Sequence, residues 1–266
     1  MIFFEGDEGF RIQGLNFSYG FVGHSTSERF LIRKSRALVE RYVQLCKNLE
    51  ASSIVELGIA EGGSVALLSL LAKPRRLVAL ELNAQPVRAL DEFIERRGLS
   101  GAVRPYYGMD QADRDRVGAI MDEEFPGGPL DLVIDDASHL LAESRLSFES
   151  LFPRLRPGGL FVIEDWNGKH LLSDRMLTTM QSQSKSERNA SERQIGERVV
   201  SDGIPPIPLY RLVVELMLAR ASSGHAVEEI NIDEFWTVIR RGPAELDPAT
   251  FRVADLYHDH FGILGR

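Results

Sequence analysis

The sequence predicts an α/β protein with a doubly wound, mainly parallel β-sheet. Short apolar segments typical of buried strands alternate with segments of helical periodicity, and glycine or proline separates many of them. The predicted strands are 53–57, 77–82, 103–107, 130–134 and 160–163, and the helices between them are 63–71, 86–97, 112–124 and 143–155. A helix at about 209–221 then leads to an antiparallel pair at 230–232 and 236–240, which makes seven strands.

The segments on either side of this alternation have weaker patterns. Residues 1–50 predict an N-terminal arm followed by a helix at 26–48, with Ser25 or Thr26 as its N-cap. Residues 51–266 form the main predicted domain, and a polar stretch within about 167–203 predicts a mobile lid. The sequence contains no internal repeat and gives no sign of a second domain.

Composition narrows the classes of function. The chain has 266 residues and a formal net charge of −8, which disfavours binding to nucleic acid phosphates. No apolar run reaches the roughly 18 residues of a membrane-spanning helix, and the N-terminus lacks a signal-peptide pattern, so we expect a cytoplasmic protein. The single cysteine, Cys46, forms no internal disulfide and is expected to be a packed thiol.

Carboxylates follow four of the five parallel strands at the point where each strand ends. In a doubly wound sheet these ends meet along one edge, where ligands bind near the switch in strand order. Acidic side chains crowded there repel one another unless a cation joins them. The residues concerned are Glu56, Glu81, Asp135, Asp136, Glu164 and Asp165.

The loop after the first strand predicts a nucleotide-like ligand. Its glycines, including Gly58 and Gly63, allow a close backbone approach to a ligand, although a simple tight turn would also use them. Glu81 ends the second strand, at the position where an acidic residue hydrogen-bonds the ribose diol in nucleotide-binding sheets. The alternative interpretation is that Glu81 is a solvated surface residue. Asp110 follows the third strand and is placed either to touch an adenine or to cap a helix.

The strongest indication of chemistry is the pair of segments 134–139 and 163–165. Asp136, Glu164 and Asp165 supply hard oxygen ligands, which suit Mg²⁺ or Ca²⁺. His139 follows Asp136 by three residues and is a candidate general base. The alternatives are a helix cap for Asp136 and a structural role for His139.

The run from Glu56 to Trp166 resembles the class I S-adenosylmethionine (SAM)-dependent methyltransferases. Within them it is similar to the macrocin and mycinamicin type of metal-dependent sugar O-methyltransferases, with cephalosporin-hydroxylase-like relatives. The matching motifs are Glu56-Leu-Gly-Ile-Ala-Glu-Gly-Gly-Ser64, Gly108-Met-Asp-Gln-Ala-Asp113, Ile134-Asp-Asp-Ala-Ser-His139, Leu155-Arg-Pro-Gly-Gly159 and Ile163-Glu-Asp165. One departure is Ala137, where a glycine is common.

The resemblance implies a Rossmann-like sheet of seven strands with one antiparallel strand, and an enzyme that methylates a hydroxyl of a sugar or saccharide. It implies SAM and Mg²⁺ as cofactors, and it implies a homo-oligomer. The implied metal ligands are Asp136, Glu164 and Asp165, with His139 as the base. The implied SAM-binding residues are Glu56, Gly58, Glu81, Asp110 and Asp135. The regions outside this run match less clearly, so the acceptor is left open.

Three other functions fit parts of the pattern. An NAD-dependent oxidoreductase would explain the glycine loop and Glu81, but it gives no role to three carboxylates at strand ends. A methyltransferase of catechol-like or other natural-product hydroxyls would use the same metal site, because vicinal phenols also chelate Mg²⁺. A non-catalytic scaffold would bind SAM without turnover.

Overall fold

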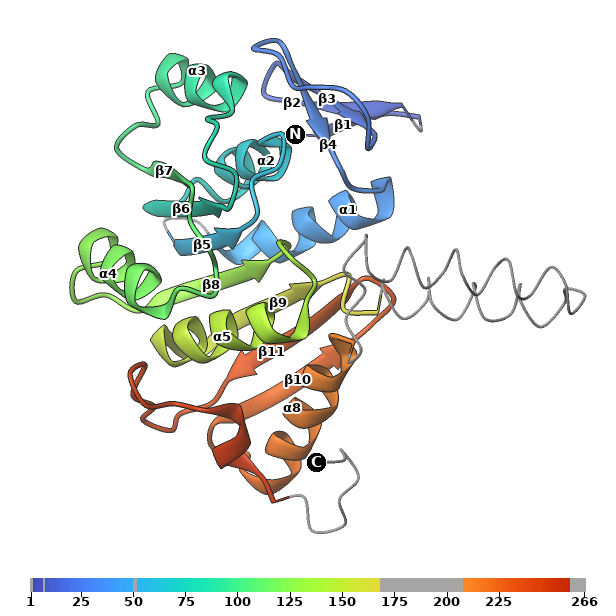
Figure 1. The fold of residues 1–266 in the computed structure, drawn as a ribbon. Coiled ribbons are helices and arrows are strands. Elements are labelled where there is room, and N and C mark those ends of the chain that lie inside the picture. The colour runs from blue at the N-terminus through green and yellow to red at the C-terminus, as the bar shows by residue number, and fades with distance from the viewer. Residues whose placement is uncertain (1, 7, 50–51, 168–207, 259–266) are drawn as a thin grey trace, which may run out of the picture.

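The computed structural model describes residues 2–6, 8–49, 52–167 and 208–258, and a seven-stranded sheet crosses the molecule (Figure 1). Its strand order is β10-β11-β9-β8-β5-β6-β7. The strands are β5 (Ser53–Leu57), β6 (Arg76–Glu81), β7 (Val103–Tyr107), β8 (Leu130–Asp135), β9 (Leu155–Glu164), β10 (Val227–Ile232) and β11 (Trp236–Arg241). Because β11 is antiparallel to both of its neighbours, it alone runs against the other six. The predicted sheet is therefore confirmed.

Helices cover both faces of this sheet, as the apolar strands require. One face packs against α1 (Arg36–Leu45), α2 (Gly63–Ala72) and α3 (Arg88–Arg96), and the other against α4 (Arg114–Glu124), α5 (Leu141–Leu151) and α8 (Tyr210–Ser222). Successive strand residues point to opposite faces: Ile54 joins the first core and Val55 the second. This alternation also decides which way each acidic side chain at a strand end points.

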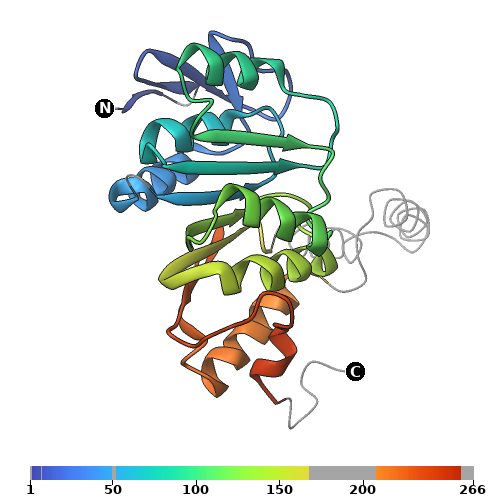
Figure 2. The ribbon, with the colours of Figure 1, turned by 90° about the vertical axis from the view of Figure 1, so that its left-hand side faces the viewer.

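The N-terminal region forms a second sheet, which the sequence patterns did not predict. Its strands are β1 (Ile2–Glu5), β2 (Gly9–Ile12), β3 (Leu15–Tyr19) and β4 (Arg29–Ile32), in that order. Figure 2 shows them beside α3, where Phe30 meets Phe93 edge to face, with ring centroids 5.6 Å apart. The N-terminal arm is thus a folded part of the molecule.

The predicted helix at 26–48 is wrong over its first ten residues. The apolar run Phe30–Ile32 belongs to β4, which pairs in parallel with β3, and this pairing outweighs the helical spacing of the leucines. Helix α1 begins only at Arg36, with Ser35 as its N-cap accepting a hydrogen bond from the Leu38 amide. Neither Ser25 nor Thr26 caps it.

The end of the predicted helix at 143–155 is also corrected. Helix α5 stops at Leu151, a short 3₁₀ turn follows, and β9 already begins at Leu155, because Leu155 pairs with Leu130 of β8. The predicted lid, apart from residue 167, lies outside the described residues. Within the described part of the chain, no helix is both long and apolar enough to span a membrane.

Candidate active site at the carboxyl ends of the strands

A cavity of about 540 Å³ opens where the strand order reverses, between β5 and β8. Of the residues predicted to bind a cofactor, Gly58, Glu81 and Asp110 line it. Asp136 of the predicted metal site lines it as well, so the two predicted sites adjoin. The remaining wall comes mostly from the loops after β5, β6, β7 and β8, with Leu80 of β6, Glu143 of α5 and Arg33 of the N-terminal region.

Contacts with Asp136 and with Glu81 hold the glycine-rich loop after β5 in place. Gly58 has a φ of +93°, and a Cβ there would lie 2.4 Å from the Asp136 carbonyl oxygen, so this position requires glycine. The Glu81 carboxylate accepts hydrogen bonds from the amides of Ile59 and Ala60, both at 3.0 Å. Glu81 therefore fixes the loop and still lines the cavity.

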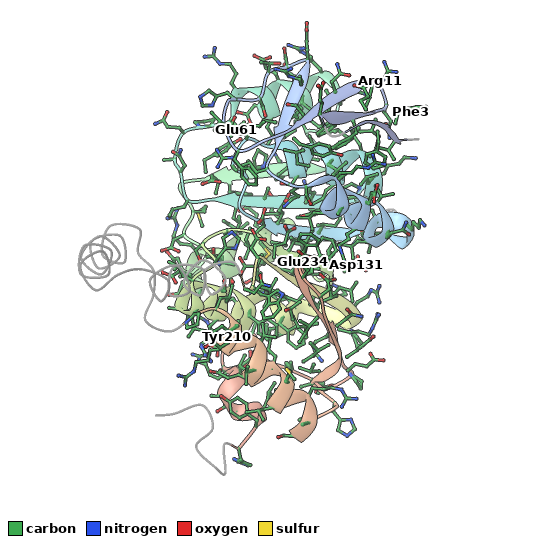
Figure 3. All side chains as sticks on the ribbon, turned by 90° about the vertical axis from the view of Figure 1, so that its right-hand side faces the viewer. Phe3, Arg11, Glu61, Asp131, Tyr210 and Glu234 are labelled. Carbon is green, nitrogen blue, oxygen red and sulfur yellow. The ribbon has the colours of Figure 1, made fainter. Side chains whose placement is uncertain are left out.

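The loop also holds the N-terminal sheet against the cavity. The Glu61 side chain accepts a hydrogen bond from the Ser25 amide at 3.0 Å, and the Ser25 hydroxyl donates to the Glu61 carbonyl at 2.6 Å. Glu61, labelled in Figure 3, lies beside the N-terminal strands and lines the cavity itself. The segment after β4 thereby brings Arg33 and Lys34 to the site.

Asp110 and Gln111 line the cavity from the loop after β7. Asp110 is exposed and accepts a hydrogen bond from the Ala112 amide, whereas Asp113, not Asp110, is the N-cap of α4. The Gln111 side chain accepts from the Ser138 amide at 3.2 Å and donates to Asp135. Gln111 thus connects the loop after β7 to the loop after β8.

Asp135 points to the α5 face of the sheet and is not a lining residue of the cavity. It is 2% exposed and accepts hydrogen bonds from Gln111 and, at 2.9 Å, from the Ser147 hydroxyl. Burial raises its pKa, and these hydrogen bonds oppose the rise. Its contact with the cavity is indirect, through Gln111.

Glu56 points to the α1 face and is also buried beside the cavity rather than in its wall. Burial raises its pKa to about 8; the nearby Lys34 ammonium and the Ser64 hydroxyl oppose this rise, while Asp136 and Glu164 add to it. At neutral pH Glu56 is therefore largely protonated. The sequence placed Glu56 and Asp135 in the cofactor pocket, and the structure instead buries both carboxyls behind its lining.

A buried lysine joins two of the predicted metal ligands. Lys34 Nζ donates to Asp136 Oδ2 and to Glu164 Oε2, each at 2.8 Å, with the Lys34 side chain 3% exposed. The other oxygen of Glu164 accepts a short hydrogen bond from the Tyr42 hydroxyl of α1. Burial alone would lower the pKa of Lys34, but Asp136 and Glu164 outweigh it and raise that pKa, so the ammonium stays charged.

Asp136, His139 and Asp165 converge beside this ion pair. One ligand atom from each lies within 4.8 Å of the others, and His139 Nε2 is 3.9 Å from Asp136 Oδ1. His139 and Asp165 both have a positive φ, of 53° and 48°. Such a backbone is uncommon for residues other than glycine, although Asp and His adopt it more readily than most, and it is found often at functional sites.

This cluster fits a hard divalent cation. Asp136 and Asp165 offer the carboxylate oxygens that Mg²⁺ prefers, and a bound ion would offset their charge. Asp165 is exposed and Asp136 and His139 are half-buried, which leaves room for water or substrate oxygens. Glu164, the third predicted ligand, instead has both oxygens bound by Lys34 and Tyr42.

Lys34 and Tyr42 are the site residues that the sequence did not reveal. Residues 26–48 were expected to form one helix, and within that pattern Tyr42 is an ordinary core position. The signal that was available is electrostatic: buried carboxylates at neighbouring strand ends require a compensating cation. That argument predicts a charge but does not say which lysine or arginine supplies it.

The reversed seventh strand, the glycine-rich loop and the cavity at the switch point define the fold of the class I methyltransferases. Residues 55–166 match the family described as "Methyltransferase domain". The match includes the strand ends and loops from Glu56 to Asp165.

Two curated relatives share parts of this region. Demethylmacrocin O-methyltransferase of Streptomyces fradiae is 43% identical over 74 residues, which cover 22% of this chain and 19% of that protein. Mycinamicin VI 2''-O-methyltransferase of Micromonospora griseorubida is 66% identical over 38 residues, which cover 14% and 10%. The matched segments thus span a fifth or less of these relatives' own length.

Solved structures share the fold over more of the chain. The methyltransferase MycE, in complex with Mg, SAH and mycinamycin VI, superposes with a TM-score of 0.51 at 20% identity, covering 78% of this chain and 49% of that one. A Staphylococcus aureus protein described as a caffeoyl-CoA O-methyltransferase gives a TM-score of 0.52 at 15% identity, covering 79% and 86%. At these identities the similarity concerns the fold alone.

Proposed function

We propose that this protein is an O-methyltransferase that moves the methyl group of SAM to a hydroxyl of a saccharide-bearing small molecule, with Mg²⁺ as metal and His139 as base. The observation that carries the proposal is the convergence of Asp136, His139 and Asp165 next to the cavity lined by Gly58 and Glu81. A nucleotide-like ligand and a hard cation can therefore lie side by side.

The relatives support the choice of reaction and acceptor. The curated proteins named above are O-methyltransferases, and one is named for the 2''-oxygen of mycinamicin VI. A third relative, from Streptomyces olivaceus, is named as a 2'-O-methyltransferase of a rhamnosyl tetracenomycin and is 41% identical over 85 residues, 26% of this chain and 21% of that protein. MycE was solved with Mg and SAH.

The walls of the cavity contain groups suited to the methyl donor. Gly58 lets the backbone approach a ligand closely. Glu81 Oε1 accepts one hydrogen bond, from the Asn83 amide, and retains a lone pair for a ribose hydroxyl. Asp110 is exposed beside the same space and can accept hydrogen bonds from an adenine. Glu56 and Asp135 support this wall from behind.

In this proposal Asp136 and Asp165 hold the metal, which supplies positive charge that makes a nearby acceptor hydroxyl easier to deprotonate. His139 accepts the proton of that hydroxyl. The acceptor oxygen forms its bond to the methyl carbon while the bond from that carbon to the sulfonium sulfur breaks, and the electron pair stays on sulfur. The rigid strand ends contribute by holding these groups in line.

Calorimetric titration with SAM and with NAD tests the cofactor. Methyl transfer from labelled SAM is then measured on glycosides, free sugars and catechols, with EDTA and with Mg²⁺ restored. We expect SAM binding, transfer to a glycoside and loss of transfer in EDTA. Binding of NAD instead of SAM, or transfer that survives EDTA, would contradict the proposal; transfer only to catechols would change the acceptor class.

Replacement of His139 tests its role as base. The His139→Ala variant should lose roughly 10²- to 10⁴-fold in turnover, the usual contribution of a positioned general base, while its affinity for SAM stays close to that of the wild type. The exposed His225 provides a matched control, since His225→Ala should leave turnover unchanged. Full turnover in His139→Ala would show that another group removes the proton.

Assembly and location are separate from these tests. The homo-oligomer and the cytoplasmic location stay predictions, as does closure of the segment at 167–203 over the acceptor.

A further inference from the structure

The walls of the candidate cofactor cavity are acidic, with one exception. Among the lining residues that the structure describes, Arg33 alone is a lysine or arginine. The acids in the same wall are Glu61, Glu81, Asp110, Asp136 and Glu143. Such a wall attracts the positive groups of a ligand, and it leaves the neighbourhood of Arg33 as the place for a negative group.

A small recess adjoins the cavity beside Arg33. It has a volume of about 30 Å³ and shares Arg33 and Gly58 with the cavity, whereas Glu81 does not line it. Gly63 and Ser64, the first residues of α2, form part of its wall. The N-terminus of a helix carries partial positive charge, so α2 adds to the attraction that Arg33 exerts on an anion.

Lys34 is the other cation at the recess, and its donors are already in use. Its ammonium donates to Asp136 and Glu164, each at 2.8 Å, and its side chain is 3% exposed. The Arg33 side chain is 47% exposed, and its Nη2 lies 3.9 Å from Glu61 Oε1. This distance is too long for a hydrogen bond, so the Arg33 guanidinium keeps donors for a ligand.

We propose that Arg33 binds the α-carboxylate of SAM, so that the protein recognises the amino-acid end of its cofactor as well as the adenosine. This inference rests on the proposed function and adds a residue that the sequence patterns did not single out. SAM has a positive sulfonium and amino group and a single negative carboxylate at neutral pH. Arginine suits that carboxylate because its planar guanidinium can donate two parallel hydrogen bonds to it.

The N-terminal sheet holds Arg33 beside the recess. Arg33 directly follows β4, and the Leu31 carbonyl oxygen of that strand would lie 2.4 Å from a Cβ at Gly63. On the other side Glu61 faces Arg33 and accepts a hydrogen bond from the Ser25 amide at 3.0 Å. Binding of the amino-acid end therefore depends on a sheet that lies outside the central sheet.

Calorimetric titration with SAM and with decarboxylated SAM tests this assignment on the full-length protein, with Mg²⁺ present throughout. The two ligands have the same adenosine, sulfonium and amino groups and differ in the carboxylate. We expect the wild-type protein to bind SAM about tenfold more tightly than decarboxylated SAM. Arg33→Met should weaken SAM binding by about tenfold and binding of decarboxylated SAM by less than about twofold, which removes the preference.

Arg29→Met is the matched control for the loss of one positive charge. Arg29 is exposed on β4 and is not among the described residues that line the cavity, so both affinities should stay unchanged. Arg33→Lys keeps the charge without the paired donors and should retain part of the preference. Circular dichroism checks that each variant folds, and Arg33→Gln is a second variant with the same expected loss as Arg33→Met.

Two results would overturn the assignment and leave the proposed methyl transfer intact. One is an unchanged affinity for SAM in Arg33→Met. The other is an equal loss of affinity for SAM and for decarboxylated SAM, which would mean that Arg33 does not act through the carboxylate. A wild-type protein that binds no SAM would instead contradict the proposed function, and the assignment of Arg33 would fall with it.

Discussion

Acidic residues that are close in the sequence have very different environments in this protein. Asp135 and Asp136 are consecutive, yet Asp135 receives hydrogen bonds from Gln111 and Ser147 on the α5 face, while Asp136 meets Lys34 on the α1 face. Glu56 shares the α1 face and is fully buried. The period of two along a strand separates these roles, because it sends neighbouring side chains to opposite faces.

The raised pKa of Glu56 gives the protein a pH-dependent stability. Its pKa is about 8 in the folded protein and 4.5 ordinarily, so between these pH values the folded state binds more protons than the unfolded state. The free energy of unfolding therefore falls as pH rises through this window, by at most about 1.4 kcal/mol per pH unit for one group. Glu56→Gln should flatten this fall in urea unfolding measured from about pH 5 to 8.

Glu164 contributes in the same direction, because burial, followed by repulsion from Asp136, raises its pKa to about 7 against the opposing effect of Lys34. Some pH dependence should therefore persist in Glu56→Gln. Replacement of the exposed Glu28 by Gln is the control and should keep the wild-type slope. A Glu56→Gln variant with an unchanged slope would show that Glu56 is not protonated on folding.

At the level of elements, the turn from β5 into α2 is the most constrained connection of the site. Gly58 requires a positive φ and close contact with the loop after β8, and Gly62 is the left-handed N-cap of α2. The Gly63 position is equally close to the N-terminal sheet, since a Cβ there would lie 2.4 Å from the Leu31 carbonyl oxygen. Three elements therefore meet at this turn without side chains between them.

Gly58→Ala should be strongly destabilising for this reason. The added methyl group would meet the Asp136 carbonyl and favour a different φ, with an expected loss of about 2–4 kcal/mol in the free energy of unfolding. Gly101→Ala is the matched control, because a Cβ there meets nothing within 4 Å. Urea unfolding measures both, and equal stability of the two variants would show that the turn adapts to a side chain.

At the scale of the whole molecule, the N-terminal sheet and the central sheet share one apolar core. Phe30 of β4 is fully buried between Phe17 of β3 and Phe93 of α3, and this core extends through α1 to Trp236 of β11. The same packing brings Lys34 to the acidic strand ends. We therefore expect the two sheets to unfold together.

Phe30→Ala tests this coupling. Truncating a fully buried phenylalanine should lower the free energy of unfolding by about 3–5 kcal/mol. The two tryptophans, Trp166 and Trp236, lie just after β9 and on β11, and neither belongs to the N-terminal sheet, so their fluorescence reports on the central sheet. In a single cooperative unit the fluorescence and circular dichroism transitions shift together; an unshifted fluorescence transition would indicate that the sheets unfold independently.

The sequence by itself determined the central sheet, because buried strands and the helices between them have distinct periodicities and clear stop signals. It also determined that acidic groups collect at one edge, since parallel strands end together. It predicted a metal site of Asp136, Glu164 and Asp165 beside His139; the structure brings Asp136, His139 and Asp165 together, whereas Glu164 is bound by Lys34 and Tyr42. Of the predicted cofactor-binding residues, Gly58, Glu81 and Asp110 line one cavity. These assignments depend on local pattern and on the direction of the strands.

Only the tertiary structure decided the N-terminal sheet and the partners of the buried acids. β4 forms by pairing with β3, and Lys34 lies 102 residues before Asp136 and 130 before Glu164, so no local pattern encodes either contact. Burial also separates Glu56 and Asp135 from the cavity that their sequence positions suggested. The physical reason is that the electrostatic state of an acidic side chain depends on which distant groups fold against it.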